Sequence, residues 1–285
     1  MVLGCGDVGL RFSRMYAGRL RIVGIVRRDE ARDAVRAAGA LPLRADLDAR
    51  RGLRRLAGLA PRVLHSAPPP TEGRDDPRTR HALVAMHRAQ AWVYLSTTGV
   101  YGDCAGARFD ETRAVAPRND RAVRRVAAER ALRRRAARGA VRATVLRVPG
   151  IYAAERLPLE RLQRGTPALV DADDVHTNHI HADDLARIAF VALMRGHSQR
   201  TVHAVDDSSM RMGEYFDAVA RAYGLPPPPR LPRDALRAAV SPMLWSFMSE
   251  SRRLDNRRLR RELRVRLRWP TVDAFLQAHG GSTAS

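Results

Sequence analysis

Three glycines near the start of the chain have the spacing that dinucleotide-binding turns use for phosphate groups. Gly4, Gly6 and Gly9 form G-x-G-x-x-G between a short apolar run and a stretch whose apolar residues have helical spacing. In this context the first glycine allows a tight turn, the second leaves room for a pyrophosphate, and the third lets helix and strand pack closely. The N-terminus of the following helix then attracts the phosphates. The pattern predicts a dinucleotide site, with a chance glycine-rich turn as the alternative.

Two arginines could select the cofactor. Arg27 and Arg28 follow the second apolar run, about 20 residues after the glycines, at the position that contacts the adenosine ribose. An acidic residue here accepts a hydrogen bond from the ribose 2′-hydroxyl, whereas arginine accommodates a 2′-phosphate. We therefore expect NADP(H) to be preferred, with NAD(H) possible. Solvated arginines without a ligand are the alternative, because exposure is the default for this residue type.

The elements that must position these residues alternate along the first half of the chain. Apolar runs predict strands over residues 2–3, 20–26, 40–47, 62–65, 91–95 and 143–147. Helical spacing predicts helices over residues 30–38, 49–59, 77–90 and 121–138. This alternation is typical of an α/β fold with a doubly wound parallel sheet. Ligands of such folds bind at the carboxyl ends of the strands, where Ser66, Thr97 and Pro149 are expected to converge.

Composition narrows the class of protein. The chain has 285 residues, a formal net charge of +21 and no lysine, and its arginines occur in almost every segment. Because a clustered basic stripe and a known motif are both missing, we expect no specific nucleic-acid partner. No apolar run approaches the ~18 residues of a membrane span, and the N-terminus lacks a signal-peptide pattern, so we expect a cytoplasmic protein without membrane contacts. Cys5 and Cys104 offer neither a disulfide framework nor zinc spacing.

Eight short motifs together resemble one protein family. They are LGCGDVG (3–9), RADLD (44–48), SAPPP (66–70), LSTTGVYGD (95–103), DET (110–112), LRVPGIY (146–152), NHIHADDLA (178–186) and RRLDNRRLRREL (252–263). The set resembles the extended short-chain dehydrogenase/reductases, the NAD-dependent epimerase/dehydratase superfamily, over nearly the whole chain. The G-x-G-x-x-G spacing, in place of G-x-x-G-x-x-G, is similar to that of an atypical branch that includes the YeeZ-type proteins.

The resemblance implies a Rossmann domain of the extended type and a smaller C-terminal substrate lobe. Residues 1–150, completed by about 179–205, would form the Rossmann domain, and residues 151–178 and 206–285 the lobe. A homodimer is possible by analogy with related folds. The implied cofactor contacts are Gly4, Gly6, Asp7, Val8, Gly9, Arg27, Arg28, Asp46, Leu47, Ser66, Ala67, Ser96 and Pro149.

The catalytic motif that the resemblance implies is incomplete in this chain. Members of the family use a Tyr-x-x-x-Lys pair, in which tyrosine exchanges the substrate proton and lysine holds the ribose, beside a serine or threonine. Thr97, four residues before Tyr101, matches the hydroxyl position, but Arg121 and Arg125 stand where tyrosine and lysine belong. Arg125 could still bind ribose or phosphate. Arg121 cannot exchange the proton, because guanidinium stays protonated in proteins.

Three interpretations of these substitutions are open. Arg121 and Arg125, one helical turn apart, could clamp an anionic substrate or a cofactor phosphate. They could instead form a solvated helix face, with Arg125 reaching Glu129. Alternatively, the chemistry could survive with a substitute acid. Tyr101 is the first candidate because it shares a loop with Thr97, and His65 is the second because it ends a predicted strand and titrates near neutrality.

Two further groups of residues have competing interpretations. One lacks the ligand spacing of a zinc motif, so no metal is expected there: His176, His179, His181, Asp183 and Asp184. The other could meet an anionic substrate or form a charged helix face: Arg252, Arg253, Arg257 and Arg258. The combined expectation is an NAD(P)-binding oxidoreductase, epimerase or dehydratase that acts on a small polar or nucleotide-linked substrate through non-standard acid/base residues. A catalytically inactive NADP(H)-binding sensor or scaffold is the alternative.

Overall fold

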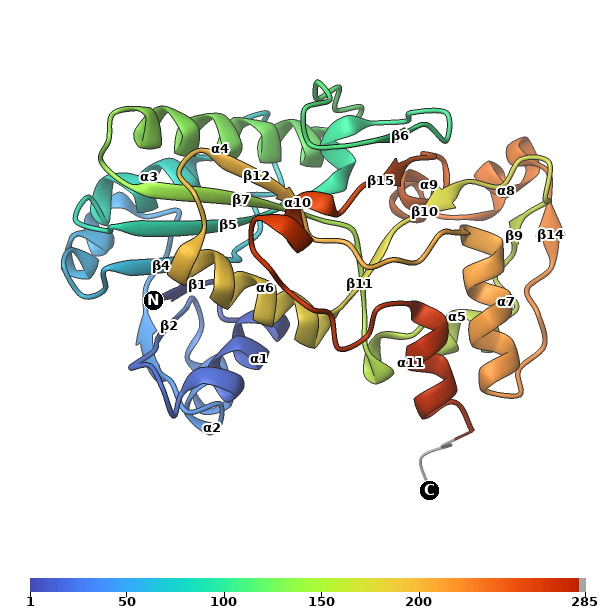
Figure 1. Cartoon of the computed structure of the whole chain (residues 1–285), viewed down its shortest axis with the longest axis horizontal. Coiled ribbons are helices and arrows are strands. Elements are labelled where there is room, and N and C mark those ends of the chain that lie inside the picture. Colours follow the sequence, from blue (N-terminus) through green and yellow to red (C-terminus); the bar gives the residue numbers. More distant parts are fainter. Residues whose placement is uncertain (282–285) are drawn as a thin grey trace.

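A seven-stranded parallel sheet forms the centre of the computed structural model, which describes residues 1–281 (Figure 1). Its strands are β1 (Val2–Leu3), β2 (Val23–Val26), β3 (Leu41–Arg44), β4 (Arg62–His65), β5 (Ala91–Thr97), β7 (Arg142–Val148) and β12 (Arg200–His203). Their order is β12-β7-β5-β4-β1-β2-β3, and every neighbouring pair is parallel. The order reverses between β1 and β4, which marks the ligand crevice of a doubly wound sheet. The predicted fold class is confirmed.

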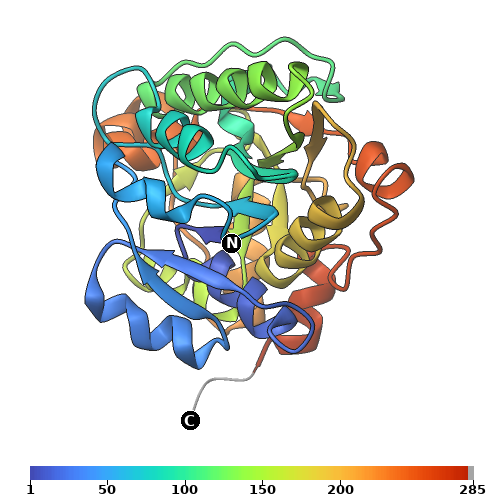
Figure 2. The ribbon, with the colours of Figure 1, turned by 90° about the vertical axis from the view of Figure 1, so that its left-hand side faces the viewer.

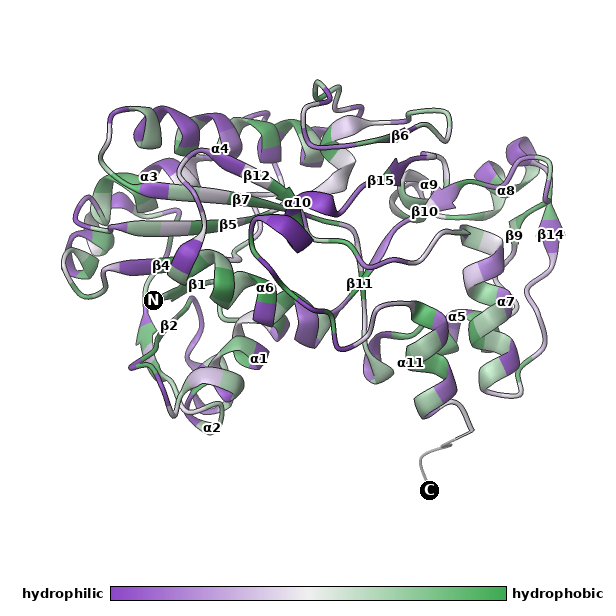
Figure 3. Ribbon diagram, viewed as in Figure 1, coloured by the Kyte–Doolittle hydropathy of each residue, from purple (hydrophilic) through white to green (hydrophobic). Residues whose placement is uncertain are grey.

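Helices cover both faces of the sheet (Figures 1 and 2). One face carries α1 (Asp7–Tyr16), α2 (Arg32–Ala37), α6 (Ala182–Arg195) and α10 (Arg257–Arg261), and the other carries α3 (Pro77–Ala85) and α4 (Asp120–Ala137). Because both faces are covered, the central strands are continuous apolar runs, as Ala91–Leu95 shows. Polar and apolar stretches alternate along α4 and α6, as expected of helices that bury one face (Figure 3).

Several predicted elements differ in extent or type; for example, the strand predicted over 40–47 spans Leu41–Arg44 only. The second strand begins at Val23 and not at residue 20. Residues 50–56 form a 3₁₀ helix, η2 (Arg50–Leu56), in place of the predicted α-helix, because Gly52 and Gly58 weaken helical propagation there. The helix predicted over 77–90 ends at Ala85, since Met86 leaves the helical conformation and its carbonyl closes a turn with the N–H of Ala89. The other short 3₁₀ segments are η1 (Asp29–Ala31), η3 (Thr98–Tyr101) and η4 (Ala154–Arg156).

Most elements of a second, smaller layer follow β7 in the sequence. This layer contains α5 (Leu159–Gln163), α7 (Met212–Ala222), α8 (Arg233–Ala239), α9 (Pro242–Met248) and α11 (Val272–His279). Short strand pairs tie it together: β8 (Gly150–Tyr152) with β11 (His179–His181), β9 (Ala168–Leu169) with β14 (Arg230–Leu231), β10 (His176–Thr177) with β13 (Met210–Arg211), and β6 (Arg108–Phe109) with β15 (Arg253–Leu254). Its own apolar core includes Leu162, Phe216 and Phe275.

The division of the chain into a Rossmann domain and a lobe follows these two cores. We propose the predicted boundaries with one change. Leu259, Leu263 and Val265 pack with the helices under the sheet and not with the core of the lobe, so residues 257–265 belong with the Rossmann domain. Within residues 1–281, no helix combines the length and the apolar character that crossing a bilayer requires.

Candidate cofactor and substrate site

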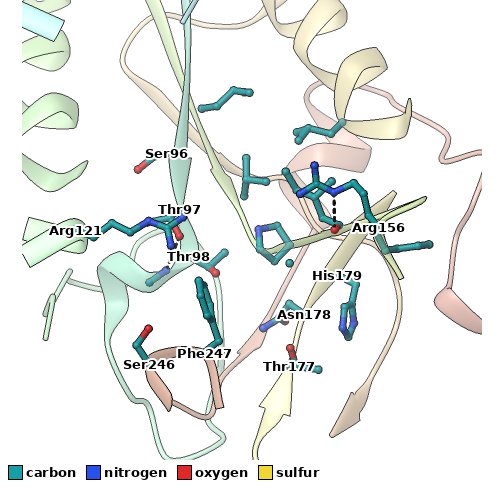
Figure 4. Close-up of a pocket in the computed structure, with 18 of the residues that line it drawn as sticks. Ser96, Thr97, Thr98, Arg121, Arg156, Thr177, Asn178, His179, Ser246 and Phe247 are labelled. Carbon is teal, nitrogen blue, oxygen red and sulfur yellow. Dashed lines mark hydrogen bonds between the residues drawn. The ribbon is translucent and has the colours of Figure 1, made fainter. Parts of the chain in front are cut away.

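A cavity of about 860 Å³ lies at the carboxyl edge of the sheet, between the glycine turn and the lobe. Figure 4 shows side chains from both sides of it, among them Thr97, Arg121 and Asn178. The predicted site residues that line it are Gly4, Gly6, Asp7, Val8, Gly9, Ser66, Ser96, Thr97, Arg121, Arg125 and Pro149. The predicted residues outside its lining are Arg27, Arg28, Asp46, Leu47, Ala67 and Tyr101.

The three glycines of the turn occupy three different environments. Gly4 has φ +79°, and a Cβ there would lie 2.5 Å from the Cα of Ala67. A Cβ on Gly9 would lie 2.9 Å from Cγ1 of Val2, which is the close approach of α1 to β1. A Cβ on Gly6 would meet no atom within 4 Å, since this residue faces the cavity. The turn therefore leaves its open space where a pyrophosphate would approach the N-terminus of α1.

Ion pairs neutralise the charge of Asp7 at the start of α1. Its Oδ1 accepts from Nε of Arg11 at 2.9 Å, and its Oδ2 accepts from Nη1 of Arg156 at 2.8 Å. Arg11 also pairs with Asp183 at 2.6 Å and with Glu155. Two arginines thus reduce the repulsion between Asp7 and a phosphate on the turn. The same ion pairs connect α1 to the first residues of the lobe.

The serines and the alanine predicted as cofactor contacts are fixed in place by hydrogen bonds or packing within the protein. Ser66 donates from Oγ to the carbonyl oxygen of Gly4 at 2.8 Å, which fixes the turn from the end of β4. Ala67 is buried and packs behind Gly4. Ser96 is 4% exposed and donates to Oε1 of Glu129 at 2.6 Å. The hydroxyl groups of both serines are therefore already hydrogen-bonded to the protein.

The predicted adenosine contacts lie at the ends of β2 and β3, outside the cavity lining. Arg27 and Arg28 are exposed directly after β2, and neither forms a hydrogen bond or an ion pair with residues 1–281. Asp46 is exposed and accepts from the backbone N–H of Asp48 at 2.9 Å, whereas Leu47 is buried. Two arginines whose guanidinium groups form no salt bridge thus remain at the edge of the sheet where a dinucleotide fold binds adenosine, although the charge of Arg27 interacts with the carboxylate of Asp48.

Thr97 ends β5 at the cavity with a partly free hydroxyl. Its Oγ1 accepts from the backbone N–H of Gly99 at 3.2 Å, which starts η3. The hydroxyl hydrogen has no acceptor among the residues that the structure describes. In Figure 4, Thr97 and Arg121 both lie on the sheet side of the cavity. The hydroxyl can therefore donate to a ligand oxygen.

Arg125 is buried, so the predicted solvated helix face is wrong for this residue. It is 8% exposed, and its Nη1 donates to the carbonyl oxygen of Leu95 at 2.6 Å and to the hydroxyl of Tyr94 at 3.1 Å. The predicted contact with Glu129 does not form. Glu129 instead accepts two hydrogen bonds from Arg147, because the side chain of Arg147 points from β7 toward α4.

Arg121 differs from Arg125 in having no strong partner. It is exposed at the cavity, and its guanidinium carbon lies 5.4 Å from the ring centroid of Phe247 on α9. Partial burial, and second the charge of Arg125, lower the pKa of Arg121. It forms no ion pair within residues 1–281. A guanidinium in this position can contact an anionic ligand.

The two predicted substitute acids lie outside the cavity. Tyr101 is 2% exposed, and its hydroxyl lies 2.6 Å from both Nε2 of His203 and Nη1 of Arg147. Burial raises the pKa of Tyr101 to about 12. His65 is fully buried against Trp92 and Tyr94, and burial lowers its pKa to about 3. Neither geometry agrees with an acid that reaches a substrate, because η3 and β4 direct the two side chains into the protein.

His179 and His181, which the sequence places in one group of possible metal ligands, pack against different partners in the structure. The His179 ring lies 4.4 Å from that of Tyr215, and burial lowers the pKa of His179 to about 3. His181 packs on Tyr152 and accepts from the backbone N–H of Asp183 at 3.2 Å, as the cap of α6. These contacts are those of residues that join the lobe to the sheet.

Sequence reasoning missed the cavity residues that the lobe supplies. They include Arg156, Arg161, Asn178, Tyr215, Phe216, Phe247 and Glu250. Arg252 also lines the cavity, and the predicted charged helix face is wrong for it, since it is 9% exposed and donates to the carbonyl oxygen of Gly102 at 2.7 Å and to Glu250 at 2.6 Å. In the sequence, the substrate lobe implied by the resemblance and Arg252 as a candidate anion contact were the signals that this part of the chain reaches the site.

Comparisons with known proteins agree with this architecture. A model of the "NAD dependent epimerase/dehydratase family" matches residues 78–205. A solved structure of a functionally unknown conserved protein from Silicibacter pomeroyi is 31% identical to this chain with a TM-score of 0.81, and the match covers 97% of this chain and 96% of that one. No curated protein sequence matches the chain.

Two more distant structures share the fold and carry NAD. MoeE5 in complex with UDP-glucose and NAD is 19% identical, with a TM-score of 0.76 over 97% of this chain and 95% of its own. A double mutant of DesIV, a dTDP-glucose 4,6-dehydratase from Streptomyces venezuelae with NAD and DAU bound, is 16% identical, with a TM-score of 0.75 over 99% and 97%. Membership of the YeeZ-type subgroup stays a prediction. The motifs, the family model and the parallel sheet with its glycine turn establish that the chain belongs to the NAD dependent epimerase/dehydratase family.

Proposed function

We propose that this protein binds NADP(H), with NAD(H) as a possible second cofactor, and acts as an oxidoreductase, epimerase or dehydratase on a small polar or nucleotide-linked substrate. The observation that carries the proposal is one cavity lined by the glycine turn, by Thr97 and by the lobe. A cofactor on the turn and a substrate against the lobe would share that space. The neighbour MoeE5, solved with NAD and UDP-glucose, supports a nucleotide-linked substrate.

The glycine turn fits a dinucleotide. Gly6 leaves open space at the N-terminus of α1, and the positive φ of Gly4 bends the backbone away from that space. The backbone N–H groups at the start of α1 would hold the pyrophosphate, while Ser66 fixes the turn and Pro149 lines the cavity. When bound, NAD(P) supplies the hydride acceptor or donor.

The side chains around Thr97 determine what the protein itself, apart from the cofactor, would contribute to the reaction. Thr97 would donate its free O–H to a substrate oxygen and so orient the reacting carbon. Arg121 would contact a negative charge on the substrate, and it would not take up a proton because guanidinium stays protonated. Arg125, which is bound to Leu95 and Tyr94, would stiffen this side of the cavity. The proton would therefore be exchanged by a group other than the residue that aligns with the catalytic tyrosine.

The preference for NADP(H) rests on Arg27 and Arg28. Both are exposed after β2, and neither side chain forms a hydrogen bond or salt bridge within residues 1–281. Asp29, the next acid in the sequence, pairs with Arg44 at 2.7 Å, and Asp48, whose carboxylate also interacts with the charge of Arg27, pairs with Arg78 at 2.7 Å. Asp29 is thus occupied, and the two arginines can bind a 2′-phosphate. The proposal also includes a cytoplasmic location. It further includes a possible homodimer, and size-exclusion chromatography of the purified protein tests this oligomeric state.

The test is a pair of fluorescence titrations with NADPH and with NADH, on the unchanged protein and on the Arg27→Ala/Arg28→Ala variant. We expect tighter binding of NADPH and a loss of that preference in the variant. The control is Arg32→Ala/Arg36→Ala, which removes the same charge from the neighbouring α2, where both arginines pair with local carboxylates; it should keep the preference. If neither nucleotide binds at millimolar concentration, the cofactor proposal fails.

A non-catalytic NADP(H) sensor or scaffold is the second candidate. It is favoured by the position of Arg125, whose hydrogen bonds to Leu95 and Tyr94 leave it committed to the protein in place of the catalytic lysine. A screen of sugar nucleotides, aldehydes and ketones for NADPH consumption separates the two candidates. Turnover that persists in Arg121→Ala but is lost in Thr97→Ala refutes the sensor, and nucleotide binding without any turnover favours it.

A further inference from the structure

The charges on the cavity wall are unbalanced. Five arginines line it, Arg121, Arg125, Arg156, Arg161 and Arg252, together with two carboxylates, those of Asp7 and Glu250. Arg156 pairs with Asp7 and Arg252 with Glu250, so the carboxylates are used. This leaves an excess of three positive charges, and none of those three arginines forms an ion pair within the part of the chain that the structure describes.

Arg161 is the unpaired arginine that lies on the lobe. It projects from α5 between α7 and α9, where its guanidinium carbon lies 4.2 Å from the ring centroid of Phe216. Its Nη2 donates to the carbonyl oxygen of Pro167 and contacts Sδ of Met248, each at 3.1 Å. Its Nε is buried without an acceptor, and no described residue accepts from Nη1. The contacts fix the guanidinium and leave part of its hydrogen-bonding capacity unused.

The surroundings of Arg161 make its charge costly without a ligand. Phe216 and Met248 contact it, and Met212, Tyr215 and Leu244 line the same end of the cavity. Burial is the cause that lowers the pKa of Arg161 to about 10, and no acid offsets it. The group stays charged near neutrality, so the fold holds an uncompensated, half-buried cation against apolar side chains. Such perturbed groups concentrate at sites that bind or react.

We infer that Arg161 binds a carboxylate or phosphate group of the substrate at the lobe end of the cavity, separate from the phosphates of the dinucleotide. The inference rests on the proposed function, because it takes substrate and cofactor to share this cavity. The glycine turn lies on the Rossmann side of the cavity, whereas the contacts of Arg161 are all with residues of the lobe, so we place the inferred anion site apart from the pyrophosphate. The apolar wall beside it suits the uncharged body of the same ligand.

The experiment is calorimetric titration of the nucleotide-saturated protein with two probes, uridine diphosphate and D-glucuronate. The first carries phosphates and the second a carboxylate, so the two arms distinguish the source of the anion. We expect one probe to bind and Arg161→Met to weaken it by about tenfold to a hundredfold, the effect of losing a charged hydrogen bond. The matched control is Arg164→Met, at the C-cap of the same helix but exposed and paired with Glu160; it should stay within about twofold of the unchanged protein, as surface pairs contribute little.

Stability gives a readout that does not depend on activity. Since Arg161→Met removes an uncompensated charge from apolar surroundings, the unliganded variant should unfold at the same or a higher urea concentration. If the variant does not fold, Arg161→Gln replaces it in both measurements. Unchanged probe binding in the folded variant overturns the inference, and so does the absence of binding of either probe to the unchanged protein at millimolar concentration.

Different measurements decide the cofactor proposal and the inference about Arg161. NADPH and NADH titrations of the unchanged protein decide the cofactor proposal, and Arg161→Met should leave them unchanged because the residue lies on the lobe. If no nucleotide binds, the same probe titrations on the nucleotide-free protein still decide whether Arg161 holds an anion.

Discussion

The contrast between Gly4 and Gly6 gives the sharpest test of the cofactor site. Both glycines belong to one turn, but only Gly6 faces open space, since a Cβ there would have no atom within 4 Å and the residue has φ −85°. Gly6→Ala therefore introduces a methyl group into the cavity without strain. Because alanine restricts the unfolded chain more than glycine does, we expect stability equal to that of the unchanged protein or up to about 1 kcal/mol higher.

Gly4→Ala should behave in the opposite way. The residue has φ +79°, which costs a non-glycine residue about 1–2 kcal/mol, and its Cβ would overlap the backbone of Ala67 at 2.5 Å. Overpacking of this kind costs about 1–3 kcal/mol more. We expect the free energy of unfolding to fall by about 2–5 kcal/mol in total.

Urea unfolding and NADPH fluorescence titration measure the two effects independently. Gly6→Ala should keep its unfolding midpoint but lose NADPH affinity by more than about tenfold, since the methyl group occupies the space of the pyrophosphate. Gly4→Ala should lose both. If Gly6→Ala binds NADPH as tightly as the unchanged protein does, the phosphates do not lie on this turn and the argument from the glycines is refuted.

The buried polar groups give three other predictions. Glu129→Gln should lower the free energy of unfolding by about 3 kcal/mol in urea, because it leaves Arg147 buried without its counter-ion; no loss would mean that the pair is dispensable. Tyr101→Phe should lower stability by about 1–3 kcal/mol through the lost partner of Arg147 yet leave NADPH binding unchanged, and a selective loss of nucleotide affinity at unchanged stability would contradict its placement outside the cavity. Burial lowers the pKa of His65 and His179 to about 3, below the ~6.5 of unfolded histidine, so the unfolded state binds more protons below pH ~6.5 and stability should fall as the pH decreases. Urea midpoints that are equal at about pH 7 and about pH 5 would contradict this.

Elements defined by local pattern are predictable from the sequence. The strand predicted over 62–65 has the observed ends, because a buried parallel strand is a short apolar run with turn residues on each side. The helix predicted over 121–138 differs by one residue at each end, and Asn119 caps it as a side chain of this type does at helix starts. The glycine turn is equally predictable, since its three roles depend on neighbours within a few residues.

Contacts between distant segments are not predictable in this way. Arg252 has the sequence context of a charged helix face, but it donates to the carbonyl oxygens of Thr98 and Gly102, about 150 positions earlier in the chain. Tyr101 shares a loop with Thr97, which makes it a candidate acid, whereas its direction is set by Arg147 on β7 and His203 on β12. A sequence without aligned relatives carries no record of such pairings.

The two arginines of α4, Arg121 and Arg125, have different surroundings, and we therefore propose different roles for them. Arg125 uses its Nη1 for hydrogen bonds with the end of β5, among them one to the carbonyl oxygen of Leu95, so a substrate cannot draw that group away without breaking a buried bond, whereas its Nε has no acceptor among the described residues. Arg121, one turn earlier, lies over the ring of Phe247 and forms no ion pair with the described residues, so its charge is available to a ligand. With Arg121 on the sheet side and Arg161 on the lobe, the cavity presents cations at two separated places. With the proposed roles of both arginines, that arrangement favours a substrate with negative charge at both ends over a neutral alcohol or ketone, because charge recognition would occupy the position that the resemblance assigns to the catalytic tyrosine.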